Sequence, residues 1–168
     1  MLFVCPLSRL EETVARTRAE RVVSLLAAGT ALVRPAAIEP RHHLLLSMHD
    51  IAGPQAEMTP PGQEHVERLI AFARDWRRTR PTVVHCYAGI SRSTAAAYII
   101  AAALAPDRDE RDIARALRLA SPSATPNPRL VALADDLLAR NGRMVAAVAE
   151  IGRGAEAYEG TPFELAIG

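Results

Sequence analysis

Apolar and polar positions along the chain follow two alternating patterns. Short runs rich in valine, isoleucine and leucine predict strands, and longer stretches with apolar residues at helical spacing predict helices between them, as in a layered α/β domain. The expected strands are Leu2–Cys5, Arg21–Leu26, His43–Met48 and Thr82–Cys86. The expected helices are Ser8–Arg18 (with Ser8 placed to cap it), Gln63–Arg78, Ser91–Ala105, Asp109–Leu119, Asn127–Ala139 and Arg143–Ile151.

The stretch Ser91–Ala105 is apolar almost all round, so we expect a helix that is buried at the centre of the molecule. The last residues, Gly152–Gly168, show no regular pattern and are expected to form an irregular tail. The chain has no repeat, low-complexity tract or linker. Residues 1–168 therefore predict a single α/β domain, with a small central, mostly parallel β-sheet flanked by helices and a helical C-terminal half.

Two polar stretches interrupt the apolar pattern. Residues 51–62 contain two glycines and three prolines, and proline both restricts the residue before it and lacks a backbone donor, so we expect a non-helical loop. Residues 107–112, DRDERD, are expected to form the solvated start of a helix.

The composition is that of a globular chain, because 168 residues with 49% hydrophobic and 23% charged side chains are enough for one sizeable core. Twenty basic residues against nineteen acidic ones leave a net charge of +1, which argues against nucleic acid as a partner. All the basic residues are arginines, which excludes a Walker-type phosphate loop and a lysine Schiff base. Any bound phosphate must be held by arginine and backbone amides.

Neither the two cysteines nor the five histidines follow a zinc-binding spacing, so no metal site is expected. Cys5 is interpreted as a small buried hydrophobe, with a disulfide that protects Cys86 as the alternative. The chain start lacks the basic and apolar regions of a signal peptide, and the longest apolar run is shorter than the roughly 20 residues of a membrane helix. We therefore expect a cytoplasmic protein with no membrane partner.

The segment His85–Thr94, HCYAGISRST, carries the candidate chemistry between an expected strand and the buried helix. The strand delivers Cys86 to a turn whose backbone N–H groups can curl inward, and the positive end of the following helix faces the same point. Arg92 adds a planar fork of donors that matches two phosphate oxygens. The residues of the turn are Tyr87, Ala88, Gly89, Ile90 and Ser91. This pattern predicts a phosphate cradle with a sulfur at its floor.

The same surroundings act on the sulfur itself. A helix N-terminus and a nearby cation favour the thiolate form of a cysteine, so we expect Cys86 to be a nucleophile at neutral pH. Ser93 is placed to donate a hydrogen bond to this sulfur, and His85 to support the turn from behind.

This segment resembles the Cys-x5-Arg-Ser/Thr signature of protein tyrosine phosphatases, and most closely that of dual-specificity phosphatases. The matching positions are His85, Cys86, Gly89, Ser91, Arg92 and Ser93. Farther along, Pro126 and Asn127 resemble the family's Pro-Asn segment ahead of a late helix, which implies a supporting role for Asn127. The order of elements from about residue 21 to 139 is similar to the family's catalytic core, whereas the C-terminal helix and tail, 140–168, match nothing in it.

The resemblance implies that Cys86 attacks phosphorus to form a cysteinyl-phosphate, which water then hydrolyses. Arg92 and the amides of residues 87–91 would stabilise the phosphate oxygens, and no metal or organic cofactor is implied. An aspartic acid on a loop before the cysteine would protonate the leaving group. Asp50, 36 positions before Cys86, is the candidate, because Asp75 falls within an expected helix.

The neutral side chains in the turn fit a singly phosphorylated substrate, so we expect a phosphorylated protein or peptide, with phosphate or sulfate able to occupy the site. Phosphotyrosine is favoured, and phosphoserine and phosphothreonine are further candidates. Two alternatives stay open. One is a cysteine phosphatase for a phosphoinositide, a nucleotide or an RNA end, and the other is a catalytically weak phosphate-binding module.

Overall fold

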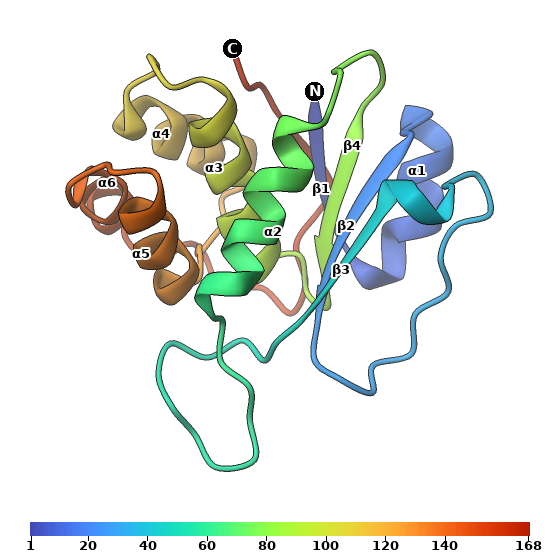
Figure 1. Ribbon diagram of the computed structural model, residues 1–168, viewed down its shortest axis with the longest axis horizontal. Helices are drawn as coiled ribbons and strands as arrows, with labels where there is room; N and C mark the ends of the chain where they lie inside the picture. The colour runs from blue at the N-terminus through green and yellow to red at the C-terminus, as the bar shows by residue number, and fades with distance from the viewer.

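A five-stranded β-sheet forms the middle of the molecule, with the strand order β3-β2-β4-β1-β5 (Figure 1). The computed structural model describes all 168 residues. Four strands are parallel, and the short edge strand β5 runs antiparallel to β1. The strands are β1 (Leu2–Pro6), β2 (Arg21–Leu26), β3 (His43–Ser47), β4 (Thr82–Cys86) and β5 (Phe163–Leu165).

Helices cover both faces of this sheet unequally. Five of them form a layer on one face, and α1 packs alone on the other (Figure 1). The helices are α1 (Leu10–Thr17), α2 (Gln63–Arg74), α3 (Arg92–Leu104), α4 (Glu110–Ala120), α5 (Pro128–Leu137) and α6 (Arg143–Ile151). The predicted single-domain α/β fold, with its mostly parallel sheet and helical C-terminal half, is confirmed.

The core lies mainly between the sheet and the five-helix layer, where 34 buried residues form one cluster. At its centre, α3 is buried on all sides, as its apolar sequence predicted. Alanines at 95–97 and 101–102 let neighbouring elements approach α3 closely. This packing fixes the N-terminal end of α3 at the carboxyl ends of the parallel strands, where β4 delivers Cys86.

Four expectations about local structure were wrong, and the first two concern helix boundaries. Ser8 does not cap a helix: Leu7–Arg9 form a 3-10 turn, and the Ser8 hydroxyl donates to the Glu159 carboxylate instead. The helix expected to reach Arg78 ends at Arg74, because the next turn bends so that the Trp76 indole donates to the carbonyl of Arg80.

The third correction concerns the expected irregular tail, which contains β5. Phe163 pairs with Val4 and Leu165 with Leu2, and the two apolar side chains of β5 enter the core. A three-residue strand is too short to produce a recognisable alternation in the sequence. Consequently, the chain after α6 returns to the sheet and extends it by one strand.

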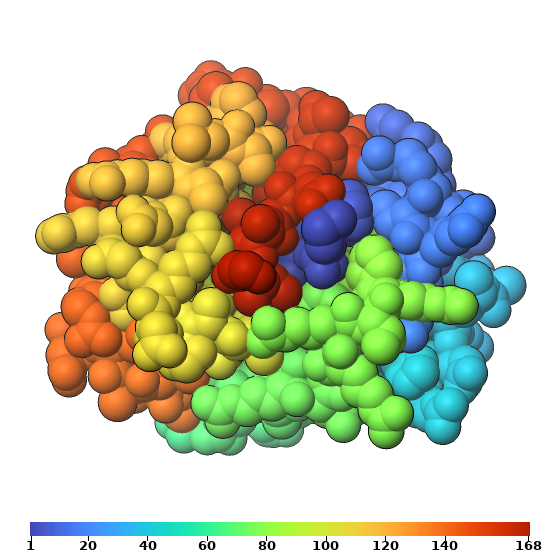
Figure 2. Space-filling model, turned by 90° about the horizontal axis from the view of Figure 1, so that it is seen from above, coloured from blue at the N-terminus to red at the C-terminus, as the bar shows by residue number.

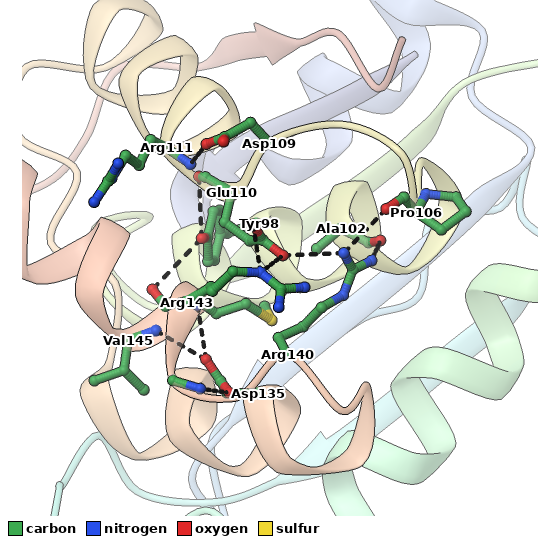
Figure 3. Close-up of polar contacts among 12 residues, drawn as sticks. Tyr98, Ala102, Pro106, Asp109, Glu110, Arg111, Asp135, Arg140, Arg143 and Val145 are labelled. Atoms are coloured by element: carbon green, nitrogen blue, oxygen red, sulfur yellow. Dashed lines mark hydrogen bonds and ion pairs between the residues drawn. The ribbon is translucent and has the colours of Figure 1, made fainter.

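An ion cluster around the buried Glu110 joins the helices of the larger layer (Figure 3). The Glu110 side chain, 7% exposed, accepts from the guanidinium groups of Arg140 at 3.0 Å and Arg143 at 3.2 Å. Arg140 also donates to the carbonyls of Ala102 and Pro106, which ties the end of α3 to the α5–α6 connection. The expectation that residues 107–112 are all solvated was therefore wrong at Glu110, since its partners lie 30 and 33 residues later.

Replacing Glu110 by glutamine is expected to lower the free energy of unfolding by about 1.5–3 kcal/mol, because the buried Arg140 and the half-exposed Arg143 both lose a charged acceptor. Urea denaturation measures this change. The matched control is Glu150→Gln, whose carboxylate pairs with Arg111 and Arg115 at the surface and should cost less than about 1 kcal/mol. Equal losses in the two variants would contradict a buried role for Glu110.

The two ends of the chain lie side by side at the end of the sheet opposite Cys86 (Figure 2). Arg108 holds the last residues there by donating to the carbonyls of Ala166 and Ile167. None of the helices is long and apolar enough to cross a membrane.

Candidate active site

The predicted phosphate cradle, residues 86–92, lies between the end of β4 and the first turn of α3. The Cys86 Sγ atom lies 3.1 Å from the Ser93 hydroxyl oxygen and 3.3 Å from the Gly89 amide nitrogen. As a thiolate, Sγ accepts hydrogen bonds from both groups. The structure therefore brings the Ser93 hydroxyl next to the sulfur.

The carbonyl groups of the cradle point away from its centre. Four of them accept hydrogen bonds from backbone amides that belong to three other parts of the chain. The pairs are Leu7 N to Tyr87 O at 3.1 Å, Gly160 N to Ala88 O at 2.7 Å, Thr125 N to Ile90 O at 2.9 Å and Asn127 N to Ser91 O at 3.2 Å.

Because a trans peptide places its N–H opposite its C=O, the amide after each of these carbonyls faces inward. The inward amides are those of Ala88, Gly89, Ser91 and Arg92. The hydrogen bond from Gly89 to Cys86 Sγ agrees with this orientation. Convergent amides at the start of a helix form an anion-binding site, so the geometry suits a phosphate above the sulfur.

Gly89 lets the cradle pack against the end of β1. Its φ angle is +71°, and a Cβ atom would lie 2.7 Å from the amide nitrogen of Pro6. A side chain here would be strained by the positive φ angle, and its Cβ atom would collide with the backbone of β1. Only glycine fits this position without a shift of the cradle or of β1.

Arg92 offers an unused hydrogen-bond donor next to the cradle. Its guanidinium group is largely buried, and Nη1 donates to the carbonyl of Met48 at 2.9 Å. Its Nε atom is buried and has no partner. A buried donor without a partner destabilises the folded protein, and a phosphate oxygen is the kind of acceptor that fits beside this Nε atom.

His85 points to the face of the sheet opposite Cys86 and is fully buried. Its Nε2 atom lies 2.6 Å from the Ser24 hydroxyl, which also contacts His43 Nε2 at 2.8 Å. Burial lowers the pKa of His85 to about 4, so it is neutral at physiological pH and adds no charge to the cradle. Ser24 and His43 were missed by the sequence analysis, although Ser24 is the one polar residue within the apolar run of β2.

Asp50 lies at the rim of the cradle. Its Oδ1 atom accepts from the Ser91 hydroxyl at 2.7 Å and from the Asn127 side-chain amide at 2.9 Å. Asn127 also caps α5, since its Oδ1 atom accepts from two amides of the first turn. The cap of α5 thereby places a carboxyl group beside the cradle, whereas Asp75 lies at the end of α2 and pairs with Arg21.

Cys5 and Cys86 lie on opposite faces of the sheet. Cys5 belongs to the small core under α1, and Cys86 belongs to the large core. Burial raises the pKa of the Cys5 thiol to about 12, which disfavours its thiolate. A disulfide that protects Cys86 would therefore require the end of β1 to rearrange.

A cleft of about 770 Å³ borders the cradle on the side of Asp50. Ile90, Ser91 and Thr125 contribute to its lining, and residues 153–158 provide the rest. No group of three or more histidine, cysteine, aspartate or glutamate side chains is arranged to hold a metal ion. The site thus combines a thiol, a ring of amides, an arginine and a carboxyl group next to an open cleft.

Comparisons with known proteins place this geometry in context. The sequence model of the protein-tyrosine phosphatase family matches residues 38–121, which is half of the chain. A comparison with curated protein sequences finds no significant match.

Solved structures share the fold at low sequence identity. DUSP15 is 20% identical, with 89% of this chain and 90% of that chain covered and a TM-score of 0.65. The Cydia pomonella PTP-2 phosphatase is 20% identical over 80% and 84% of the two chains, with a TM-score of 0.62. PTPMT1 in complex with PI(5)P is 16% identical over 89% and 94%, with a TM-score of 0.63.

Proposed function

Because the chain belongs to the protein-tyrosine phosphatase family and has a dual-specificity-phosphatase-like fold, we propose that it hydrolyses phosphotyrosine in proteins through a cysteinyl-phosphate. One observation carries the catalytic part of this proposal. The thiol of Cys86 lies at the floor of an amide-lined cradle whose rim holds Asp50. A nucleophile, an anion-binding site and a proton donor are therefore within reach of one phosphate ester.

In the first step, the phosphate binds to the inward amides of the cradle and to Arg92. The Cys86 thiolate attacks phosphorus, so that a sulfur–phosphorus bond forms while the bond from phosphorus to the leaving oxygen breaks. Asp50 gives its proton to this oxygen, which leaves as a neutral phenol or alcohol. Arg92 and the amides stabilise the charge on the remaining phosphate oxygens.

In the second step, water attacks the cysteinyl-phosphate. Asp50, now a carboxylate, accepts a proton from the water, and the sulfur–phosphorus bond breaks to release inorganic phosphate. The sulfur leaves as a thiolate, which accepts hydrogen bonds from Ser93 and Gly89. The enzyme returns to its starting state with Asp50 protonated.

The cradle supports a substrate with one phosphate group. Its variable positions, Tyr87, Ala88 and Ile90, carry no charge, and Arg92 is the single cationic side chain within it. Phosphotyrosine is the first candidate, with phosphoserine and phosphothreonine after it. A phosphoinositide is the second substrate class, because one structure with this fold, PTPMT1, is in complex with PI(5)P.

A substrate panel tests the proposal. Phosphotyrosine and phosphothreonine peptides, phosphoinositides and phosphorylated nucleotides are incubated with the protein in the presence of a chelator, and phosphate release is compared with that of Cys86→Ser. We expect the highest kcat/KM with phosphotyrosine peptides and complete loss of activity on thiol oxidation. Phosphate binding without hydrolysis above the Cys86→Ser background would indicate a binding module, and a requirement for a divalent metal would contradict the scheme.

A further inference from the structure

The segment after α6, residues 152–160, is held at both ends, by the connection before α5 and by the cradle. At one end, Gly154 donates to the Thr125 hydroxyl at 3.1 Å, and Ala155 donates to the carbonyl of Pro122 at 2.9 Å. At the other end, the Gly160 amide donates to the carbonyl of Ala88 within the cradle at 2.7 Å. We call residues 152–160 the C-terminal segment.

The contact at Gly160 depends on the absence of a side chain. A Cβ atom there would lie 2.8 Å from the carbonyl oxygen of Gly89, so backbone meets backbone directly. Next to it, the Glu159 carboxylate accepts from the Ser8 hydroxyl at 2.9 Å, and β5 follows three residues later. The C-terminal segment is therefore a fixed part of the site.

This segment lines the cleft that begins beside Asp50. A leaving oxygen has to lie within hydrogen-bond distance of Asp50 to receive its proton, so the group bonded to it extends from there. The cleft of about 770 Å³ begins at Asp50, Ile90 and Ser91 and is otherwise lined mainly by residues 153–158. The side chains of the C-terminal segment are thus placed to contact the leaving group.

Residues 153–158 form one wall of the cleft, and the polar side chains of this wall carry no net charge. Arg153 Nη2 lies 3.7 Å from Glu156 Oε1, and both side chains are mostly exposed. This pair does not favour a substrate with additional phosphate groups beside the one in the cradle. An apolar or aromatic leaving group suits the wall better.

Tyr158 is the aromatic residue of this wall and is 89% exposed. It also lines a neighbouring shallow pocket with Tyr87, which is 58% exposed, and Leu7. We propose that Tyr158 packs against the aromatic ring of the phosphotyrosine substrate and so determines specificity for aryl phosphates. This inference rests on the proposed phosphatase activity, and it assigns the choice of leaving group to the C-terminal segment.

The test is Tyr158→Ala, assayed with a phosphotyrosine peptide and with inorganic phosphate as a competitive inhibitor. Loss of one aromatic contact should raise KM for the peptide by about two- to tenfold, while kcat stays unchanged. The inhibition constant of inorganic phosphate, which has no ring, should not change. Tyr158→Phe should retain the wild-type KM, and Leu119→Ala, which removes a similarly exposed side chain from α4, should have no effect.

Two results would overturn the inference while leaving the phosphatase activity intact. One is an unchanged KM for the phosphotyrosine peptide in Tyr158→Ala. The other is an equal rise in KM and in the inhibition constant of phosphate, which would mean that the segment shapes the cradle and does not recognise the ring. Failure of the wild-type protein to hydrolyse any ester would instead reject the proposed function itself.

Discussion

Cys86→Ser is expected to reduce turnover of every phosphate ester by roughly 10⁴-fold or more, while phosphate still binds. The substitution exchanges one sulfur for an oxygen, and a serine hydroxyl is not ionised at neutral pH. The inward amides and the unpartnered Nε atom of Arg92 stay in place, so the anion site is preserved. Phosphate release measures the first effect, and calorimetric titration with inorganic phosphate measures the second.

Cys5→Ser serves as the matched control. Cys5 is also buried at the end of a strand, but on the opposite face of the sheet, so kcat should remain at the wild-type value. Acid quenching of the wild-type reaction with a radiolabelled substrate should trap phosphate on Cys86. Activity that survives in Cys86→Ser, or that depends on Cys5 instead, would refute a cysteinyl-phosphate on Cys86.

The placement of the candidate catalytic side chains next to one another could be predicted because they are local in sequence. Cys86, Arg92 and Ser93 lie within eight consecutive residues, and the strand and helix that flank them fix their relative positions. The same holds for most of the fold, since the strands β1 to β4 and the apolar helix α3 each produced a clear pattern in the sequence. Residues whose relative positions are fixed within one short segment can therefore be predicted from the sequence alone.

The hydrogen bonds that orient the cradle carbonyls could not be predicted, because they depend on contacts between segments that are distant in the sequence. The amides that bind these carbonyls come from Leu7, Thr125, Asn127 and Gly160. Neither the side chains nor the spacing of these residues indicates such hydrogen bonds in the sequence. The strand β5 was not expected for the same reason. The position of the C-terminal segment beside the cradle follows from where β5 pairs with β1, and tertiary packing alone determines this pairing.

Asp50→Asn is expected to lower kcat by about 10²–10⁴-fold with a phosphotyrosine peptide, since general acid catalysis contributes a factor of this size. Asparagine retains an oxygen that can accept from Ser91 and Asn127, so the rim of the cradle should keep its shape. The loss should be smaller with an activated aryl phosphate, whose leaving oxygen needs little protonation.

The pH profile distinguishes loss of the acid from a structural effect. The proposed reaction requires an ionised nucleophile and a protonated acid at the same time, so kcat/KM of the wild type should rise and then fall with pH. Asp50→Asn removes the group that causes the fall, so its profile should rise to a plateau. Asp75→Asn is the control, because that side chain is exposed and pairs with Arg21 away from the cradle. If Asp50→Asn kept the alkaline fall, another group would have to donate the proton, and the hydrogen bonds from Ser91 and Asn127 would only anchor the loop.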